Sequence, residues 1–357
     1  MPTPAEILDL LRQVPYPGFS RDIVSFGVIQ DIEVATGGIT VVLAPSTANE
    51  EVIAAIEARV RAAIEPMAGG AAIHLARARA PQPQARRGPQ PIDGVRDVIA
   101  VASGKGGVGK STVATNLALA LANLVPRVGL LDADVYGPSV PLMLGITEKL
   151  RAGEGGRLVP VERHGLRVLS MGMFLGDATP VIWRGPMLTK LLTEFLRNAD
   201  WGELDVLVMD LPPGTGDVQL TLTQQLPISG GIVVTTPQDV ALADVRRGIQ
   251  MFQQMQAPVL GVIENMSFHR CPSCGERSEP FGHGGAARLT AELGIPLLGE
   301  LPLVRAIREA GDRGLPLLAA EPTHPQSRAM SEIAERVLVR LRETAAARPG
   351  AATPGAA

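Results

Sequence analysis

The residues best suited to chemistry stand in a glycine-rich run that carries two lysines. The run reads Gly104-Lys105-Gly106-Gly107-Val108-Gly109-Lys110-Ser111-Thr112. An apolar stretch precedes it and a helical pattern follows it. Glycines let backbone N–H groups turn toward a pyrophosphate without Cβ clashes, and the helix start adds partial positive charge. This spacing is typical of a Walker A loop that binds ATP. We expect Lys110 on the β- and γ-phosphates, Ser111 on Mg²⁺ and Thr112 on the α-phosphate.

The same run also fits a dinucleotide-binding pattern. Gly104, Gly106 and Gly109 match Gly-x-Gly-x-x-Gly, and Asp132 ends the next predicted strand. That pattern would make the chain a nicotinamide-dependent oxidoreductase. Nicotinamide folds have no need for Lys110-Ser111 at the helix start, so the phosphate-loop interpretation is favoured.

Three aspartates follow apolar stretches that read as strands. Asp132 and Asp134 lie in LLDADVYGPS, and Asp210 lies in VLVMDLPPGTGD. The carboxyl end of a central parallel strand lies beside the phosphate loop, where a carboxylate can hold Mg²⁺ through water. An aspartate that merely opens a turn is the alternative, and it carries more weight for Asp132 than for Asp210.

The chain's two cysteines, Cys271 and Cys274, form one CPSCG run. In a reducing compartment this spacing indicates metal binding or redox chemistry and not a structural disulfide. A four-thiolate site needs two more ligands. Two chains could share one site, or His269 and His283 could complete a zinc site within one chain. A pair of unligated or redox cysteines is a third interpretation.

Composition narrows the class of protein. The 357 residues are 46% hydrophobic, 19% charged and 3% aromatic, with a net charge of −3. This gives no electrostatic or stacking argument for nucleic acid as a ligand. No apolar run reaches the roughly 20 residues of a membrane span, and the N-terminus has no apolar signal core. We therefore expect a cytoplasmic protein that binds neither nucleic acid nor membrane.

Sequence patterns predict two domains. Residues 1–78 read as a small α+β domain, 79–95 as a flexible linker, 96–343 as an α/β domain and 344–357 as a disordered tail. In the small domain we expect helices over 5–11 and 49–64, and strands over 23–29, 39–43 and 71–76. In the large domain the expected strands alternate with helices, which predicts a mainly parallel sheet covered on both faces. The expected strands are 98–102, 128–132, 166–170, 206–210, 231–236, 259–264 and 297–300.

The second lysine of the loop resembles the deviant Walker A signature of the MinD/ParA/nitrogenase-iron-protein class. In that class two subunits sandwich two nucleotides, so the resemblance implies a homodimer in which Lys105 reaches the partner's phosphates. It also implies that Asp134 positions the attacking water while Asp132 and Asp210 serve Mg²⁺. Asn265 and Pro302 match positions that frame the adenine in this class.

Four further segments resemble the Mrp/ApbC family of iron–sulfur carriers: DADVYGPSVPLMLG, WRGPMLTKLL, LPPGTGDVQLTL and ENMSFHRCPSCG with the FGHGGAARLTAELGIPLLGELPL that follows it. PGFSRDIVSFGVI resembles the assembly-factor domain that many bacterial members carry, although this copy lacks a cysteine there. The resemblance implies an iron–sulfur cluster on Cys271 and Cys274 of both chains, with 4Fe–4S favoured and 2Fe–2S left open. It also implies slow ATP hydrolysis and transfer to apo iron–sulfur proteins alongside assembly factors. A MinD/ParA-like spatial-positioning ATPase is the alternative, and it leaves the cysteines unexplained.

Overall fold

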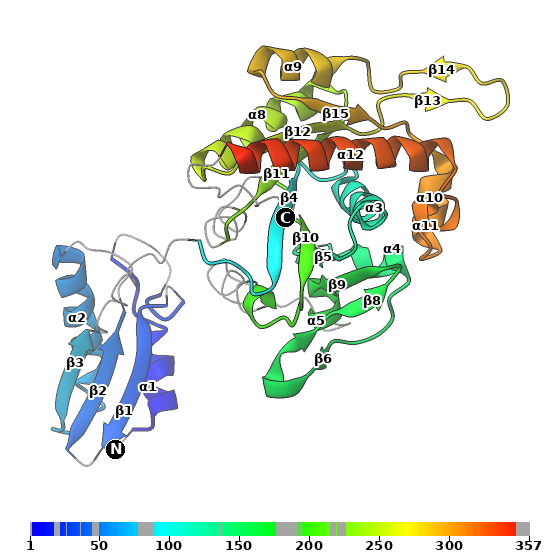
Figure 1. The fold of residues 1–357 in the computed structure, drawn as a ribbon. Helices are drawn as coiled ribbons and strands as arrows, with labels where there is room; N and C mark the ends of the chain where they lie inside the picture. Colours follow the sequence, from blue (N-terminus) through cyan, green and yellow to red (C-terminus); the bar gives the residue numbers. More distant parts are fainter. Residues whose placement is uncertain are drawn as a thin grey trace. The chain divides into compact units, whose positions relative to one another are not determined.

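The computed structural model describes residues 2–17, 22–25, 27–35, 37–44, 50–77, 89–135, 137–175, 192, 195–214, 219 and 226–347. Contacts divide the chain into two compact units, Met1–Arg87 and Gly88–Ala357 (Figure 1). Among the described residues, no helix has the length and apolar character needed to cross a membrane. The expected motif WRGPMLTKLL lies outside the described residues except for Leu192.

The first unit packs two helices on a three-stranded sheet. Its elements are α1 (Pro4–Leu11), β1 (Ile29–Ala35), β2 (Gly38–Leu43), α2 (Glu50–Ile64) and β3 (Ala72–Arg77). The central strand β2 is antiparallel to β1 and parallel to β3. Thr3 and Glu6 form a capping box that begins α1. Apolar residues of both helices and of β2 make one small core.

The strand expected over 23–29 is wrong, because β1 begins only at Ile29. The Asp22 carboxylate accepts a hydrogen bond from the Ser25 N–H at 2.7 Å, and Gly27 has a φ of 73°. Both features belong to a turn. Ile23 and Val28 are fully buried, so their apolar character reflects core packing and not an extended backbone.

The second unit is built on an eight-stranded sheet in the order β15-β12-β11-β4-β10-β5-β9-β8. All neighbours pair in parallel except the edge strand β8, which is antiparallel to β9. Every expected strand of this domain is present. The bounds are β4 (Val95–Ala102), β5 (Val128–Asp132), β8 (Val161–Arg163), β9 (Leu166–Ser170), β10 (Leu204–Asp210), β11 (Gly230–Thr235), β12 (Val259–Glu264) and β15 (Leu297–Glu300).

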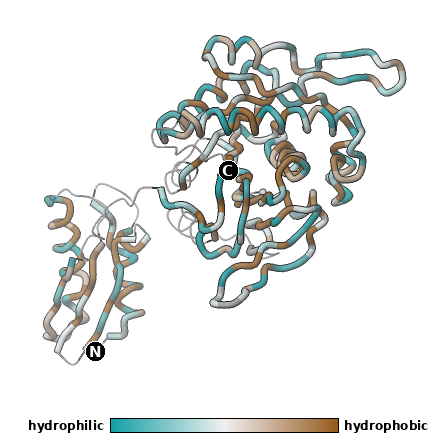
Figure 2. Tube along the Cα trace, viewed as in Figure 1, coloured by the Kyte–Doolittle hydropathy of each residue, from teal (hydrophilic) through white to brown (hydrophobic). Residues whose placement is uncertain are grey.

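Helices cover both faces of this sheet, as Figure 1 shows. On one face α3 and α12 pack against alternate strand residues, and on the other face α8 and α9 do so. The hydropathy colouring in Figure 2 follows this division, with apolar segments gathered along the central strands. The helices are α3 (Lys110–Ala122), α4 (Val140–Leu144), α5 (Met171–Leu175), α8 (Asp239–Gln254), α9 (Gly285–Leu293), α10 (Arg305–Asp312), α11 (Leu317–Ala320) and α12 (Pro325–Ala346).

Short elements complete the second unit: β6 (Arg151–Ala152) with β7 (Leu158–Val159), a 3₁₀ turn (Glu154–Gly156), and β13 (His269–Arg270) with β14 (Arg277–Ser278). Part of the segment expected as linker is ordered structure. Ile92 is buried in the core, and β4 already begins at Val95. At the other end α12 continues to Ala346, past the expected start of the tail. Residues 78–88 and 348–357 lie outside the described residues.

Gly231, in β11, lies directly against the aromatic ring of Phe252. A Cβ atom there would lie 2.6 Å from ring carbons of Phe252. We therefore expect Gly231→Ala to destabilise the second unit by about 1–3 kcal/mol through overpacking. Thermal unfolding of the full chain measures this, with Gly137→Ala as the control, since no atom lies within 4 Å of its added methyl group. Equal melting temperatures for the two variants would contradict the packing argument.

Candidate functional site

The glycine-rich loop joins β4 to α3 and is held by close backbone contacts. A Cβ atom on Gly104 would lie 2.1 Å from the Asp244 Cβ on α8, so no side chain fits there. Gly107 and Gly109 have φ angles of 83° and 79°, which glycine adopts at little cost. Gly109 also lies against the amide of Asn265, which donates to the Val108 carbonyl at 2.8 Å.

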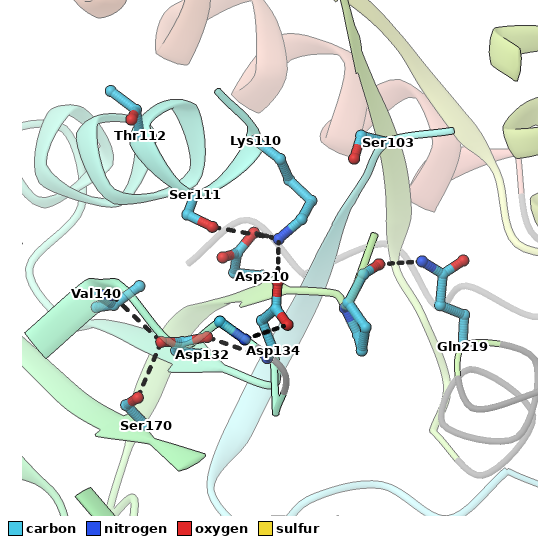
Figure 3. Close-up of polar contacts among 12 residues, drawn as sticks. Ser103, Lys110, Ser111, Thr112, Asp132, Asp134, Val140, Ser170, Asp210 and Gln219 are labelled. Carbon is cyan, nitrogen blue, oxygen red and sulfur yellow. Dashed lines mark hydrogen bonds and ion pairs between the residues drawn. The ribbon is translucent and has the colours of Figure 1, made fainter. Parts of the chain in front are cut away.

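Strand register brings the acidic residues to this loop. Asp210, at the end of β10, pairs with Val101 on one side and with Asp132 on the other. The Lys110 ammonium donates to Oδ1 of Asp210 at 2.6 Å and lies 3.9 Å from Oδ2 of Asp134. Figure 3 shows Lys110 and the three aspartates converging on one small volume, with Ser111 beside them. The structure thus brings these predicted residues together.

Asp132 is fully buried and well supplied with donors. Its carboxylate accepts hydrogen bonds from the Asp134 and Val140 N–H groups at 3.1 and 3.3 Å, and from the Ser170 hydroxyl at 2.9 Å (Figure 3). Burial nevertheless raises its pKa to about 7, and the nearby charge of Asp210 adds to this effect. Burial also raises the pKa of Asp210, against the opposing effect of the Lys110 charge.

This donor set fits a magnesium ion. Carboxylate and hydroxyl oxygens are the ligands that Mg²⁺ prefers, and Ser111, Asp132 and Asp210 supply both kinds. Oδ2 of Asp210 is buried, and no donor among the described residues reaches it. A buried anionic oxygen left in this state favours a cation partner.

A cavity of about 360 Å³ opens beside the loop. Gly109 and Thr112 line its phosphate-loop side, and Asn265 and Pro302, the two residues expected to frame adenine, line it further on. Leu142, Met143 and Ile307 add apolar surface. Its volume and mostly apolar lining are those of a small-molecule site.

Lys105 lies apart from the buried charges. Its side chain is half-buried, and its ammonium donates to the side-chain carbonyl of Gln238, just before α8, at 3.2 Å in a solvent-exposed hydrogen bond. The loop that carries it is tied down by the Ser103 hydroxyl, which donates to the Lys105 carbonyl at 3.0 Å. The lysine charge is therefore displayed on the surface beside the phosphate loop.

Both cysteines stand on the β13–β14 hairpin, which Figure 1 shows extending away from the sheet. Cys271 is half-buried and Cys274 is exposed. The Cys271 N–H donates to the Glu276 carbonyl at 2.8 Å, and the Gly275 N–H donates back to the Cys271 carbonyl at 2.9 Å. N–H groups of Cys274 and Ser273 lower the pKa of the Cys271 thiol, which favours the ligating thiolate.

The two histidines considered for a zinc site do not join the cysteines. His269 belongs to β13, and His283 contacts Arg277 and Glu279 instead. Among the described residues, no group of three or more His, Cys, Asp or Glu side chains could hold a metal ion by itself, and this applies to the aspartates beside the phosphate loop as well as to the cysteine hairpin. This geometry counts against a zinc site completed within one chain.

Three residues of this region were not anticipated from the sequence. They are Ser170, which donates to Asp132, Gln238, which accepts from Lys105, and Glu264. Glu264 is fully buried and accepts from the Ser267 hydroxyl at 2.7 Å and from the Ala286 N–H at 2.9 Å. A glutamate that ends an apolar stretch was the sequence signal available for Glu264, whereas Ser170 and Gln238 carry none.

Fold and site together define a P-loop NTPase: a parallel sheet, a Walker A loop between strand and helix, and strand-end carboxylates beside it. The model of one family, the NUBPL iron-transfer P-loop NTPases, matches residues 94–338, and the chain belongs to that family. A model of the iron–sulfur cluster assembly protein domain matches residues 4–75. The expected family, fold class and N-terminal assembly-factor domain are thereby confirmed.

Curated relatives agree with this placement. The chain is 41% identical to an iron–sulfur cluster carrier protein of Synechocystis over 343 residues, which is 94% of this chain and 97% of the relative. It is 49% identical to an Arabidopsis thaliana mitochondrial iron–sulfur protein required for NADH dehydrogenase, over 71% of this chain and 81% of the relative.

Two solved structures share the fold. A nucleotide-binding protein from Archaeoglobus fulgidus, in complex with ADP, is 38% identical with a TM-score of 0.57, over 66% of this chain and 92% of that one. The cell division ATPase MinD of Pyrococcus furiosus is 23% identical with a TM-score of 0.50, over 68% of this chain and 98% of that one. The second likeness shows the fold alone.

The raised pKa of Asp132 has a consequence for stability. Between the ordinary value of 3.8 and the folded value of about 7, the folded chain keeps a proton that the unfolded chain has released. Its free energy of unfolding therefore falls as pH rises through this window. Asp132→Asn removes the effect, so relative to the wild type it is expected to gain about 2 kcal/mol between about pH 5 and about pH 7. Urea unfolding of nucleotide-free protein measures the gain.

Asp205→Asn is the matched control. Hydrogen bonds from Arg127 lower the pKa of Asp205, so this group is ionised in both states across the same range. Its difference from the wild type should stay constant with pH. A pH-independent difference for Asp132→Asn would contradict the assignment of a proton to the buried carboxyl.

Proposed function

We propose that this chain is an ATP-hydrolysing carrier that binds an iron–sulfur cluster between two copies of itself and transfers it to apoproteins. One observation carries the proposal: two cysteines stand at the tip of an extended hairpin with no third ligand of the described chain beside them. Four-thiolate ligation then needs a second hairpin. A twofold pair of chains supplies one, and we propose a shared 4Fe–4S cluster as the cargo.

ATP is the proposed nucleotide. The loop's N–H groups would hold its phosphates, Lys110 would exchange its Asp210 partner for the β- and γ-phosphates, and Thr112 would bind the α-phosphate. The adenine would enter the cavity between Asn265 and Pro302, and the ADP bound by the Archaeoglobus relative supports this. Asp134, whose Oδ2 lies 3.9 Å from the Lys110 ammonium, would orient the attacking water.

Ser111, Asp132 and Asp210 would hold Mg²⁺, which neutralises phosphate charge when bound. The Lys105 ammonium, which donates to Gln238, would leave that partner to reach the phosphates of the second chain. We expect hydrolysis to be slow, because a complete nucleotide site requires two chains. Hydrolysis would then control the release of the cluster. We further propose that the chain acts in the cytoplasm, with apo iron–sulfur proteins and assembly factors as partners.

Two lysine substitutions test the nucleotide site. Lys110→Ala should abolish hydrolysis, because no other described cation lies at the buried end of the loop. Lys105→Ala should bind ATP yet hydrolyse it poorly, since a cation supplied in trans is worth up to roughly 10³–10⁵ in rate in other P-loop enzymes. Mixing the two variants forms one composite site with both lysines. Phosphate release should therefore recover in the mixture, and Lys105 acts within its own chain if it does not.

Cysteine substitutions test the cargo. Cys271→Ala or Cys274→Ala leaves two thiolates per dimer, so reconstituted protein should lose its iron, sulfide and brown colour and should fail to activate an apo-acceptor. ATP binding should survive, because the phosphate loop lies on separate elements. Replacement of His269 or His283 is the matched control and should leave iron content unchanged. One zinc per chain, lost with those histidines, would instead establish a structural zinc site.

A further inference from the structure

Six residues, 265–270, link the phosphate loop to the first cysteine, and they are anchored at the loop end. The Asn265 N–H donates to the Thr235 carbonyl at 2.7 Å, and its side chain donates to the Val108 carbonyl at 2.8 Å. Cys271 follows directly at the other end. Any shift of this segment therefore moves the point from which the cysteine hairpin begins.

A second segment, 301–304, both lines the cavity and is bonded to this link. All four of its residues contribute to the cavity wall. The Ser267 N–H donates to the Leu301 carbonyl at 2.9 Å, and the Leu303 N–H donates to the Phe268 carbonyl at 2.7 Å. Leu303 also forms a parallel bridge with His269. One wall of the cavity and the strand that leads to Cys271 thus form one hydrogen-bonded unit.

Met266 stands where this unit meets the phosphate loop. Its backbone has a φ of 55°, in the left-handed region that residues other than glycine rarely adopt. Its side chain lines the cavity, and its Cε atom would lie 3.5 Å from a Cβ atom on Gly109. Left-handed residues other than glycine are concentrated at ligand clamps and switch regions.

We propose that Met266 is a positioning residue through which an adenine nucleotide in the cavity sets the exposure of Cys271. A base that enters the cavity displaces the Met266 side chain, and the left-handed backbone at this position turns that displacement into a movement of residues 267–270. The Arg277 guanidinium, 4.1 Å from the centre of the Phe268 ring, carries the movement to the returning strand β14. This inference rests on the proposed function, since it takes nucleotide as the ligand of the cavity.

Thiol alkylation in cluster-free protein tests the inference. In a Cys274→Ser background, Cys271 is the chain's single thiol, and its reaction with a maleimide is timed at fixed pH with and without saturating ADP. We expect ADP to change this rate by about fivefold or more when Met266 is present, and by less than about twofold in Met266→Gly, which has neither the side chain nor the strained backbone. Met255→Ala removes a methionine that does not line the cavity, at the end of α8, and should keep the full response.

Calorimetric titration with ADP in each variant separates the possible failures. If the parent chain binds no ADP, the proposed nucleotide function fails, and this inference fails with it. If ADP binds and the alkylation rate does not change, or Met266→Gly responds as the parent does, this inference alone is overturned. Should Met266→Gly fail to fold, Met266→Asn serves instead, because asparagine tolerates the left-handed region and lacks the long side chain.

Discussion

The site depends on burying the Lys110 ammonium together with carboxylates at the carboxyl ends of two interior strands, β5 and β10, of the parallel sheet. The Lys110 ammonium lies 2.6 Å from Oδ1 of Asp210, and both side chains are buried. Removing one partner of a buried ion pair lowers the free energy of unfolding by about 3–5 kcal/mol. The register that aligns Asp210 with both Val101 and Asp132 makes the pairing possible. Glycine at position 104 lets the loop approach α8 closely, because a Cβ atom there would clash with Asp244.

The cysteine hairpin depends on the same sheet in a different way. Glu264 ends β12, and its two carboxylate oxygens accept hydrogen bonds from Ser267 and Ala286, which lie on either side of the hairpin. One buried carboxylate thus fixes both roots of the segment that displays Cys271 and Cys274. The next residue along the chain, Asn265, bonds to the phosphate loop. Two consecutive residues therefore support the cysteine hairpin and the phosphate loop.

Sequence alone predicted the strands of the large domain because buried parallel strands are near-continuous runs of Val, Ile and Leu. The phosphate-loop residues were equally accessible, since their spacing is local. Ser170 and Gln238 were not, because each meets its partner across a long stretch of chain, 38 and 133 residues respectively. The same apolar signal misled at Ile23–Ile29, where buried side chains belong to a turn that Asp22 and Gly27 determine.

The hairpin that carries Cys271 and Cys274 lies outside both hydrophobic cores of the second unit. The fold of the second unit therefore should not depend on the chemical state of the two thiols. A copy whose cysteine has been oxidised or alkylated should keep its phosphate loop and its Lys105. Under the proposed pairing, such a copy still competes for intact partners and consumes ATP within pairs that cannot hold cargo. Damage to a minority of thiols would then inactivate a larger share of the pool, as a dominant-negative allele does.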